Sequence, residues 1–293
     1  MFDTAVIGAG PAGLSAAVNA RARGLSAVVL GQKAESSMIY PAERVDNHLG
    51  MPAVSGARLI EAFTAHARES GAQTRTGRAL QIMPMDDYFV INFDNDFIEA
   101  KTVIIARGVA KSVTIKNEDV MLGSGVSYCA TCDGMLYKGK RAVVVGEIAE
   151  SVEDANFLSG ICEKVWFVPA PRAGSKEALP LERLDRRITV VNGKCREILG
   201  GAQVAGLALD SGTIDCEGVF IIKGNAPIAS LLYGLETEGD IIKVNRLCET
   251  NIPGVYAAGD CTGWPYQVSK AVGEGLVAAQ QAAKYLAGKN PAK

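Results

Sequence analysis

Two cysteines stand three positions apart in the segment Cys129-Ala130-Thr131-Cys132-Asp133-Gly134. Two intervening residues allow the sulfurs to form a small disulfide ring that opens and closes, and a neighbouring helix end can lower the pKa of a thiol. The carboxyl group of Asp133 directly follows the pair and is placed to exchange a proton with it. Half of a zinc site or a purely structural disulfide are the alternatives, but the sequence has only two histidines and no second close cysteine pair. The pattern therefore indicates a redox-active dithiol and no metal site.

A glycine-rich turn, Gly8-Ala9-Gly10-Pro11-Ala12-Gly13, follows an apolar run at residues 2–7. Gly8 permits a tight turn, Gly10 lets a pyrophosphate approach the backbone, and Gly13 lets the next helix pack closely. The amino end of that helix supplies amide donors and a favourable dipole. The acidic residue that often holds a ribose after the second strand is missing, since Leu30-Gly31-Gln32 stands there. We expect a dinucleotide at this turn, with its ribose contacts unassigned.

The elements that position these motifs follow the strand, turn, helix, strand order of a doubly wound parallel sheet. A first unit has expected strands at 2–7, 28–30 and 102–106, helices at 11–23 and 58–69, and a hairpin pairing 89–93 with 97–98. A second unit, which indicates an internal duplication, has expected strands at 141–146, 165–168, 188–191 and 218–222 and a helix at 152–159. The remaining strand at 255–258 and helix at 269–286 are too few for an independent core, so we expect them to return to the first unit.

Length and charge limit the class of protein. The chain has 293 residues, 48% of them hydrophobic, which is enough for about two domains. The 30 basic and 32 acidic residues nearly balance, so no overall field favours nucleic acid or an anionic membrane. No apolar run approaches the roughly 20 residues of a membrane span, and no leader is recognisable, so we expect a soluble cytoplasmic protein. The five other cysteines stand alone, as buried thiols do: Cys162, Cys195, Cys216, Cys248 and Cys261.

Two longer stretches resemble one family. Ser127-Tyr128-Cys129-Ala130-Thr131-Cys132-Asp133-Gly134 resembles the signature of the low-molecular-weight thioredoxin reductases, and Thr250-Asn251-Ile252-Pro253-Gly254-Val255-Tyr256-Ala257-Ala258-Gly259-Asp260 resembles their carboxyl-terminal FAD signature. Three motifs occur in the family's order over nearly the whole chain. The resemblance implies an FAD enzyme, commonly a homodimer, that reduces thioredoxin or a thioredoxin-like protein. It implies that Cys132 faces the flavin, that Cys129 attacks the substrate disulfide, and that Asp133 is the acid.

The resemblance also implies the cofactor contacts and the fold. Besides the turn of residues 8–13, Gly259 and Asp260 would hold the ribityl phosphate region of FAD. Gln267 would lie near the isoalloxazine ring, and Asn47 matches a flavin-side asparagine. The alternative is that an Asp or Gln at a strand end only caps the backbone, as such residues often do. We expect an α/β protein with two Rossmann-like domains of the three-layer ββα type that binds FAD and NAD(P). Residues 1–112 and 238–293 would form a discontinuous FAD domain, and residues 113–237 an inserted, degenerate pyridine-nucleotide-type domain that carries the dithiol.

The second unit departs from the family where NADPH should bind. The glycine-rich loop is replaced by Gly146-Glu147-Ile148-Ala149-Glu150-Ser151, in which a branched side chain stands where a pyrophosphate needs bare backbone. Glu147 and Glu150 also add negative charge. One carboxylate about 5 Å from a phosphate charge weakens phosphate binding by roughly 3 kcal/mol at an effective dielectric near 20. The family's His-Arg-Arg cluster, which grips the 2′-phosphate, is replaced by Val168-Pro169-Ala170-Pro171-Arg172. The hypothesis is that NADPH is not the electron donor.

A subgroup of thioredoxin reductases without these motifs takes electrons from reduced ferredoxin, and the sequence looks like that subgroup. A ferredoxin near about −400 mV and a thioredoxin disulfide near about −270 mV differ by about 130 mV, so two electrons release roughly 6 kcal/mol. A flavin suits this task because it takes up electrons singly and releases them as a pair. Lys138, Lys140 and Arg141 are one candidate basic patch for an acidic ferredoxin, although such a run is more often a solvated face.

We therefore interpret the chain as a flavin-dependent thioredoxin-disulfide reductase with reduced ferredoxin as donor. One alternative is an NADPH-dependent thioredoxin reductase with a divergent nucleotide loop. Another is a non-catalytic flavin-binding redox sensor. The intact dithiol speaks against the sensor, because a scaffold has no use for an exchangeable dithiol beside a flavin.

Overall fold

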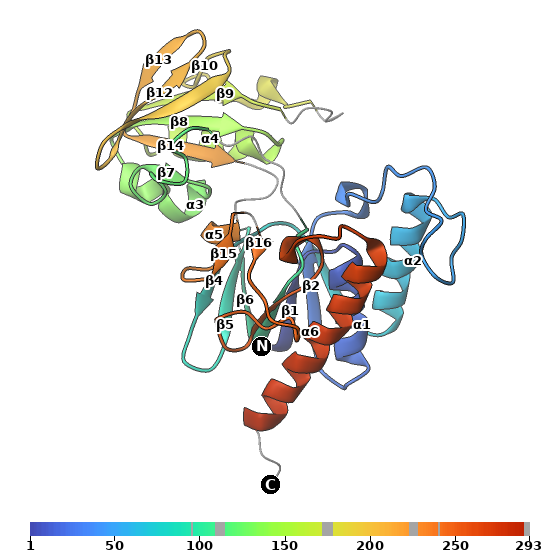
Figure 1. Ribbon diagram of the computed structural model, residues 1–293. Coiled ribbons are helices and arrows are strands. Elements are labelled where there is room, and N and C mark those ends of the chain that lie inside the picture. The colour runs from blue at the N-terminus through green and yellow to red at the C-terminus, as the bar shows by residue number, and fades with distance from the viewer. Residues whose placement is uncertain (95, 109–114, 172–177, 223–227, 240, 290–293) are drawn as a thin grey trace. The chain divides into compact units, whose positions relative to one another are not determined.

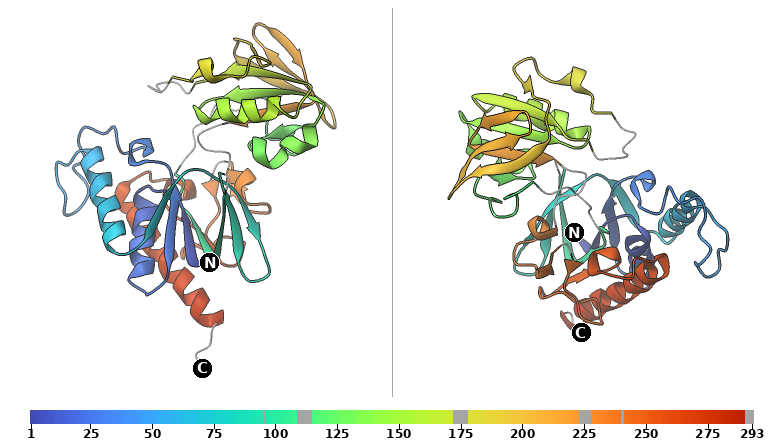
Figure 2. Two further views of the ribbon diagram at one scale, coloured as in Figure 1. Left: turned by 180° about the vertical axis from the view of Figure 1, so that it is seen from behind. Right: turned by 45° about the horizontal axis from the view of Figure 1, so that its top comes forward.

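The computed structural model describes residues 1–94, 96–108, 115–171, 178–222, 228–239 and 241–289 (Figures 1 and 2). The chain divides into two compact units, and each is described by itself. Unit 1 comprises residues 1–110 and 227–293, and unit 2 comprises residues 111–226. None of the helices in the described part of the chain combines the length and the apolarity needed to span a bilayer.

Unit 1 is built on a seven-stranded sheet in the order β3-β2-β1-β6-β5-β4, with β17 also paired to β6. The strands β1, β2, β3, β6 and β17 run parallel, and β5 pairs antiparallel with both β6 and β4. The bounds are β1 (Phe2–Ile7), β2 (Ala27–Gly31), β3 (Gln73–Thr76), β4 (Ala79–Pro84), β5 (Phe89–Phe93), β6 (Asp96–Ile105) and β17 (Val255–Ala257). The helices are α1 (Pro11–Arg21), α2 (Gly56–Glu69), α5 (Ile228–Leu231) and α6 (Val268–Lys289), and a small ladder joins β15 (Thr237–Glu238) to β16 (Ile241–Ile242).

Alternate residues of the central strands of unit 1 enter two different cores, because successive side chains of a strand point to opposite faces. On β1, Ala5 and Ile7 join the core that β4, β5 and α5 cover, while Val6 joins the core beneath α1 and α6. Burial on both faces explains why these strands read as continuous apolar runs. The unit therefore has the three-layer form.

Small residues bring α1 and α6 together over one face of this sheet (Figure 1). A Cβ added at Gly275 of α6 would collide with the carbonyl oxygen of Ala12 in α1. The other residues buried between the two helices and the sheet are largely alanines: Ala16, Ala17, Ala20, Ala271, Ala278, Ala279 and Ala282. The close approach places the start of α6 near the start of α1, where the glycine-rich turn lies.

Unit 2 repeats the same architecture. A parallel sheet in the order β10-β9-β8-β14-β7 lies between α4 and an antiparallel meander in the order β11-β12-β13. Its strands are β7 (Val126–Ser127), β8 (Arg141–Gly146), β9 (Lys164–Pro169), β10 (Thr189–Val190), β11 (Cys195–Gly200), β12 (Val204–Leu209), β13 (Gly212–Asp215) and β14 (Gly218–Ile222). Its helices are α3 (Ala130–Asp133) and α4 (Glu150–Ser159). The predicted α/β class with two Rossmann-like units is confirmed.

Several strands are not predicted by the sequence pattern: β3, β4, β7, β11, β12, β13, β15 and β16. Strand β3 is fully exposed and polar, so it carries no apolar alternation. The pairing of β11 with β12 contains register shifts that break the period of two. The segment predicted as a strand at 102–106 is the end of β6, which continues from the hairpin without a break.

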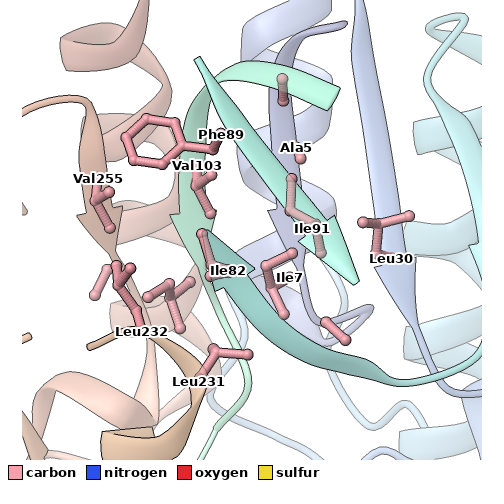
Figure 3. Close-up of a cluster of buried hydrophobic side chains, with 14 of the residues drawn as sticks. Ala5, Ile7, Leu30, Ile82, Phe89, Ile91, Val103, Leu231, Leu232 and Val255 are labelled. Atoms are coloured by element: carbon pink, nitrogen blue, oxygen red, sulfur yellow. The ribbon is translucent and has the colours of Figure 1, made fainter. Parts of the chain in front are cut away.

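The second domain boundary differs from the expected one. The sequence pattern predicts it between residues 237 and 238, yet Ile228, Leu231 and Leu232 are buried in the core of unit 1. Figure 3 shows Leu231 and Leu232 in the same cluster as Ile82 and Val255. The chain therefore returns to unit 1 before β15. The expected first boundary, at 112–113, lies outside the described residues.

Candidate active site and cofactor loops

The dithiol lies at the start of a short helix at one edge of unit 2. Cys129 and Cys132 form a disulfide with a Cα–Cα distance of 5.3 Å. Cys129 is the N-cap of α3, and its Sγ accepts a hydrogen bond from the backbone N–H of Cys132 at 3.1 Å. Cys132 is exposed and Cys129 is half-buried. At the N-terminus of a helix, the backbone amides and the helix dipole stabilise a thiolate. The position therefore suits an exchangeable cysteine pair.

The carboxylate of Asp133 is held next to this pair by Ser127. The Ser127 hydroxyl donates to Oδ2 of Asp133 at 2.7 Å, and it accepts the backbone N–H of Cys129 at 3.1 Å. Ser127 is the last residue of β7, which pairs with β14 in the parallel sheet. The structure therefore brings Cys129, Cys132 and Asp133 together in one turn.

A second buried network holds the other side of the turn. The Tyr128 hydroxyl donates to Oε1 of Glu118 at 2.8 Å, and the backbone N–H of Ile115 donates to Oε2 at 2.8 Å. Burial raises the pKa of Tyr128, and the Glu118 carboxylate raises it further. Because both oxygens of the buried Glu118 carboxylate accept a hydrogen bond, the contact between Tyr128 and Glu118 is stable and anchors the turn.

The turn between β8 and α4 keeps only the first glycine of a dinucleotide-binding turn, and the side chains of Ile148 and Ser151 replace the other two. A Cβ added at Gly146 would collide with the Ser151 hydroxyl and with the Phe167 ring. The Ser151 hydroxyl donates to the carbonyl oxygen of Ile148, and Ile148 packs against the core beneath α4. The first turn of α4 carries Glu150 and Glu153. Arg172, the remaining basic residue of the next loop, lies outside the described residues.

The glycine-rich turn of unit 1 keeps all three glycines. A Cβ added at Gly8, whose φ is +119°, would collide with the carbonyl oxygen of Ala106, and one added at Gly13 would collide with that of Gly8. A Cβ at Gly10 would meet nothing within 4 Å. Helix α1 begins at Pro11 with no side-chain cap and no acidic residue in its first turn. An open backbone at an uncapped helix start fits the pyrophosphate of FAD.

A second segment completes the cofactor cradle beside this turn. A Cβ at Gly259 would come within 2.8 Å of the Ala12 side chain, so the loop that carries Asp260 lies against the start of α1. Burial raises the pKa of Asp260, an effect that the nearby Lys270 ammonium opposes. Asn47 and Gln267 are hydrogen-bonded at 2.8 Å. The structure thus brings the turn of residues 8–13 to Gly259 and Asp260, and Asn47 to Gln267.

Three polar residues of unit 1 near the cradle had no predicted role. The Lys270 ammonium donates to the carbonyl oxygens of Gly259 and Gly263 at 2.8 Å, and Oε2 of Glu274 accepts the N–H of Gly259 at 2.8 Å. Burial lowers the pKa of Arg107, which follows β6, to about 10, a value at which it still carries its charge at neutral pH. The sequence does place Lys270 and Glu274 four residues apart on a predicted helix, but this spacing is common on solvated helices and does not by itself indicate a site.

The basic run next to the dithiol is partly neutralised. Arg141 forms an ion pair with Glu217 at 3.0 Å, and the Lys140 ammonium lies 5.3 Å from the centre of the Tyr137 ring. A cavity of about 390 Å³ lies nearby, lined by Arg141, Trp166 and the β12–β13 hairpin. None of its lining residues belongs to the dithiol turn, so it is separate from the redox site.

Comparisons with known proteins agree with this combination of sites. The sequence profile of the pyridine nucleotide-disulphide oxidoreductases matches residues 2–275. The thioredoxin reductase of Aquifex aeolicus is 31% identical over 99% of this chain and 94% of its own length. The crystal structure of a ferredoxin-flavin thioredoxin reductase from Clostridium acetobutylicum has a TM-score of 0.88 and 43% identity, covering 97% of this chain and 98% of that one. The atypical thioredoxin reductase TRi of Desulfovibrio vulgaris Hildenborough has a TM-score of 0.76 and 33% identity, covering 100% of both chains.

Proposed function

Because this chain belongs to the pyridine nucleotide-disulphide oxidoreductase family, we propose that it carries electrons from reduced ferredoxin, through FAD and the Cys129/Cys132 dithiol, to the disulfide of thioredoxin or a thioredoxin-like protein. The family and the thioredoxin reductase homologues make it an FAD-dependent disulfide oxidoreductase. The donor, the acceptor and the roles of individual residues are the parts that we propose.

Residues of unit 1 hold FAD. The backbone of the turn Gly8-Ala9-Gly10-Pro11-Ala12-Gly13 and the amino end of α1 bind its pyrophosphate. Gly259 and Asp260 hold the ribityl phosphate region, and Asn47 and Gln267 flank the isoalloxazine ring. The bound flavin supplies the conversion between single electrons and an electron pair.

Residues of unit 2 carry out the exchange with the acceptor. Cys132 would lie on the flavin side, and bound FAD would supply the electron pair that, with two protons, converts the disulfide to a dithiol. The Cys129 thiolate then attacks one sulfur of the acceptor disulfide, forming a mixed disulfide and releasing the other acceptor sulfur, which takes its proton from Asp133. The Cys132 thiolate attacks Cys129, which re-forms the enzyme disulfide and releases the second acceptor thiolate. Two electrons pass from the enzyme dithiol to the acceptor, and two protons follow them: the thiol proton of Cys129 reaches the first departing sulfur by way of Asp133, and that of Cys132 reaches the second.

The observation that carries the choice of donor is the turn between β8 and α4, which lacks the second and third glycines and begins an acidic helix turn. Ile148 and Ser151 stand at the positions of the second and third glycines of the motif, and Glu150 and Glu153 place negative charge at the start of the helix. Helix starts that bind phosphate are uncharged or basic, because the helix dipole must not be cancelled. A one-electron protein donor needs no such pocket, and the similar Clostridium protein is a ferredoxin-flavin thioredoxin reductase.

The acceptor would dock on apolar side chains beside the dithiol. Met135 and Leu136 directly follow the signature and are 62% and 69% exposed, and Phe157 of α4 is also exposed. A Cβ at Gly134 would come within 3.0 Å of the Phe157 ring, so these side chains border one surface. Exposed apolar clusters of this kind mark contact sites for other proteins. A small disulfide protein that presents an apolar rim would cover them.

Anaerobic mixing tests the donor. Purified FAD-loaded protein is mixed with NADPH or with reduced ferredoxin, and the loss of flavin absorbance is followed. Ferredoxin should bleach the flavin within the mixing time, and NADPH should leave it oxidised over minutes. The Cys129→Ser/Cys132→Ser variant is the control, because its flavin should still be bleached. Bleaching by NADPH at a comparable rate would favour the NADPH-dependent alternative.

Trapping tests the acceptor and the role of each cysteine. A Cys132→Ser variant should form a covalent complex with oxidised thioredoxin through Cys129, because the resolving thiol is gone. A Cys129→Ser variant should bind FAD but show neither the complex nor turnover. No complex with any thioredoxin-like protein, together with no turnover in the unaltered chain, would favour the redox-sensor alternative.

We further propose that the protein is a homodimer, as the family resemblance implies, and that it is located in the cytoplasm. Light scattering coupled to size-exclusion chromatography measures the mass of the particle directly. A mass of twice the 30.8 kDa of the chain is expected, and a monomer would overturn the assembly proposal.

A further inference from the structure

We infer that Ser127 is a positioning residue for Asp133, and that its hydroxyl couples the proton donor to the backbone of the nucleophilic cysteine. The inference rests on the proposed roles of Cys129 and Asp133. Ser127 belongs to the signature segment, but neither the sequence pattern nor the comparisons assign it a role.

The geometry gives the Ser127 hydroxyl one donor partner and one acceptor partner. Its single proton goes to Oδ2 of Asp133, at 2.7 Å, rather than to the Cys129 carbonyl oxygen, at 3.2 Å, because the carboxylate contact is shorter and charge-assisted. One lone pair accepts the N–H of Cys129 at 3.1 Å. The exchanged proton is therefore carried by Oδ1, the carboxyl oxygen that Ser127 does not contact.

The hydroxyl is fixed by its surroundings. Ser127 is 3% exposed and lies opposite Phe220 in the parallel pairing of β7 with β14, so its position is set by the sheet. The adjacent Tyr128 is anchored through Glu118. Asp133 itself is only half-buried, at the end of a four-residue helix. Without the Ser127 hydroxyl, the carboxylate would gain rotamers that point it away from the departing sulfur.

The chemistry predicts a dependence on the leaving thiol. An alkyl thiolate needs a proton as it departs, whereas an aromatic thiolate of low pKa departs unassisted. The loss of Ser127 should therefore slow exchange with an alkyl disulfide and leave exchange with an aromatic disulfide unchanged. A residue that only maintains the shape of the turn would affect both substrates alike.

The test uses the FAD-loaded protein, with its dithiol reduced by dithiothreitol that is then removed. Single-turnover exchange is measured with hydroxyethyl disulfide and with dithiobis(nitrobenzoate), so neither ferredoxin nor thioredoxin is required. Ser127→Ala should slow the alkyl reaction about 10- to 100-fold, the range expected for loss of a hydrogen bond to a charged group. Its rate with the aromatic disulfide should stay within about twofold, which is close to the precision of such comparisons.

Four further variants complete the design. Asp133→Asn should slow the alkyl reaction, and adding Ser127→Ala to it should have no further effect, because Ser127 acts through the carboxylate. Ser127→Thr keeps the hydroxyl and should restore the rate. If the added methyl group prevents folding, as circular dichroism would show, the inference is tested by Ser127→Ala, Asp133→Asn and their double variant alone. Ser159→Ala is the matched control, a buried serine of the same unit whose hydroxyl donates to the carbonyl oxygen of Asn156.

Equal slowing of both disulfides by Ser127→Ala, no slowing of either, or an undiminished effect in the Asp133→Asn background would overturn the inference. These outcomes are distinct from failure of the proposed function, which would show as absence of turnover with thioredoxin while the small disulfides still react.

Discussion

The Asn47 side-chain amide donates a hydrogen bond to Oε1 of Gln267 at 2.8 Å, across 220 positions of the chain. Asn47 lies in a loop closed by the backbone pairing of Val45 with Val54, and Gln267 precedes α6. Both side chains are exposed, and an exposed hydrogen bond contributes little to folding by itself. We expect the pair to act on the flavin ring, as proposed above.

Asn47→Ala and Gln267→Ala should each weaken FAD binding to the apoprotein about 3- to 30-fold, as loss of about one hydrogen bond predicts. The double variant should lose little more than either single variant, because each residue orients the other. Fluorescence titration with FAD measures the affinity. Asn19→Ala on α1 is the control and should bind FAD normally. Additive losses would mean that the two residues act independently.

The glycines of the FAD turn should respond differently to alanine. Gly13→Ala should lower both stability and FAD content, because its Cβ would collide with the Gly8 carbonyl oxygen. Gly10→Ala should leave the apoprotein folded and weaken FAD binding, since its Cβ meets only open space in the protein. Gly273→Ala in α6 also meets nothing and should be neutral or stabilising by up to about 1 kcal/mol. Thermal unfolding and flavin content separate the three.

The lone cysteines should remain unreactive when the dithiol is reduced. Burial raises the pKa of Cys216 and of Cys248 to about 12 and that of Cys162, Cys195 and Cys261 to about 11. At pH 8 a thiol of pKa about 11 is thiolate in only about one molecule in a thousand. Brief iodoacetamide treatment of reduced protein should label Cys129 and Cys132 alone, as peptide mass spectrometry would show. Rapid labelling of Cys162 or Cys195 would contradict this.

Leu136→Ser should raise the KM for thioredoxin about 5- to 30-fold, because an apolar contact worth about 1–2 kcal/mol is lost at the docking surface. Exchange with hydroxyethyl disulfide should be unchanged. Phe97→Ser is the matched control, since Phe97 is 63% exposed but lies in unit 1. An unchanged KM would place the docking surface elsewhere.

Asp3 should stabilise unit 1 in a pH-dependent way. Burial alone would raise its pKa, but hydrogen bonds from Lys101 and Ser26 outweigh burial and lower it. A lowered pKa means that the stabilisation is fully present above the ordinary value of 3.8 and is lost as pH falls through the folded-state value. Asp3→Asn should cost about 0.5–1 kcal/mol at pH 7, and urea unfolding should show the difference shrinking near pH 3. A difference that does not change with pH would assign the effect to packing.

Local patterns in the sequence determined the chemistry of the motifs and most of the secondary structure. A cysteine pair three residues apart can close a ring in any fold, and a glycine turn after an apolar strand has few stable conformations. The strands β1, β2, β6, β8 and β14 were predictable because burial on both faces requires continuous apolar runs. The loss of two motif glycines after β8 was likewise evident from the sequence alone.

Only the tertiary structure decided which side chains meet. Nothing local indicates that the Ser127 hydroxyl reaches Asp133 rather than solvent, or that Asn47 meets Gln267. The exposed polar strand β3 and the point at which the chain re-enters unit 1 depend on neighbours that are distant in sequence. A hydrogen bond needs its two atoms within a few tenths of an ångström of the right distance, and that accuracy comes from the packing of whole layers.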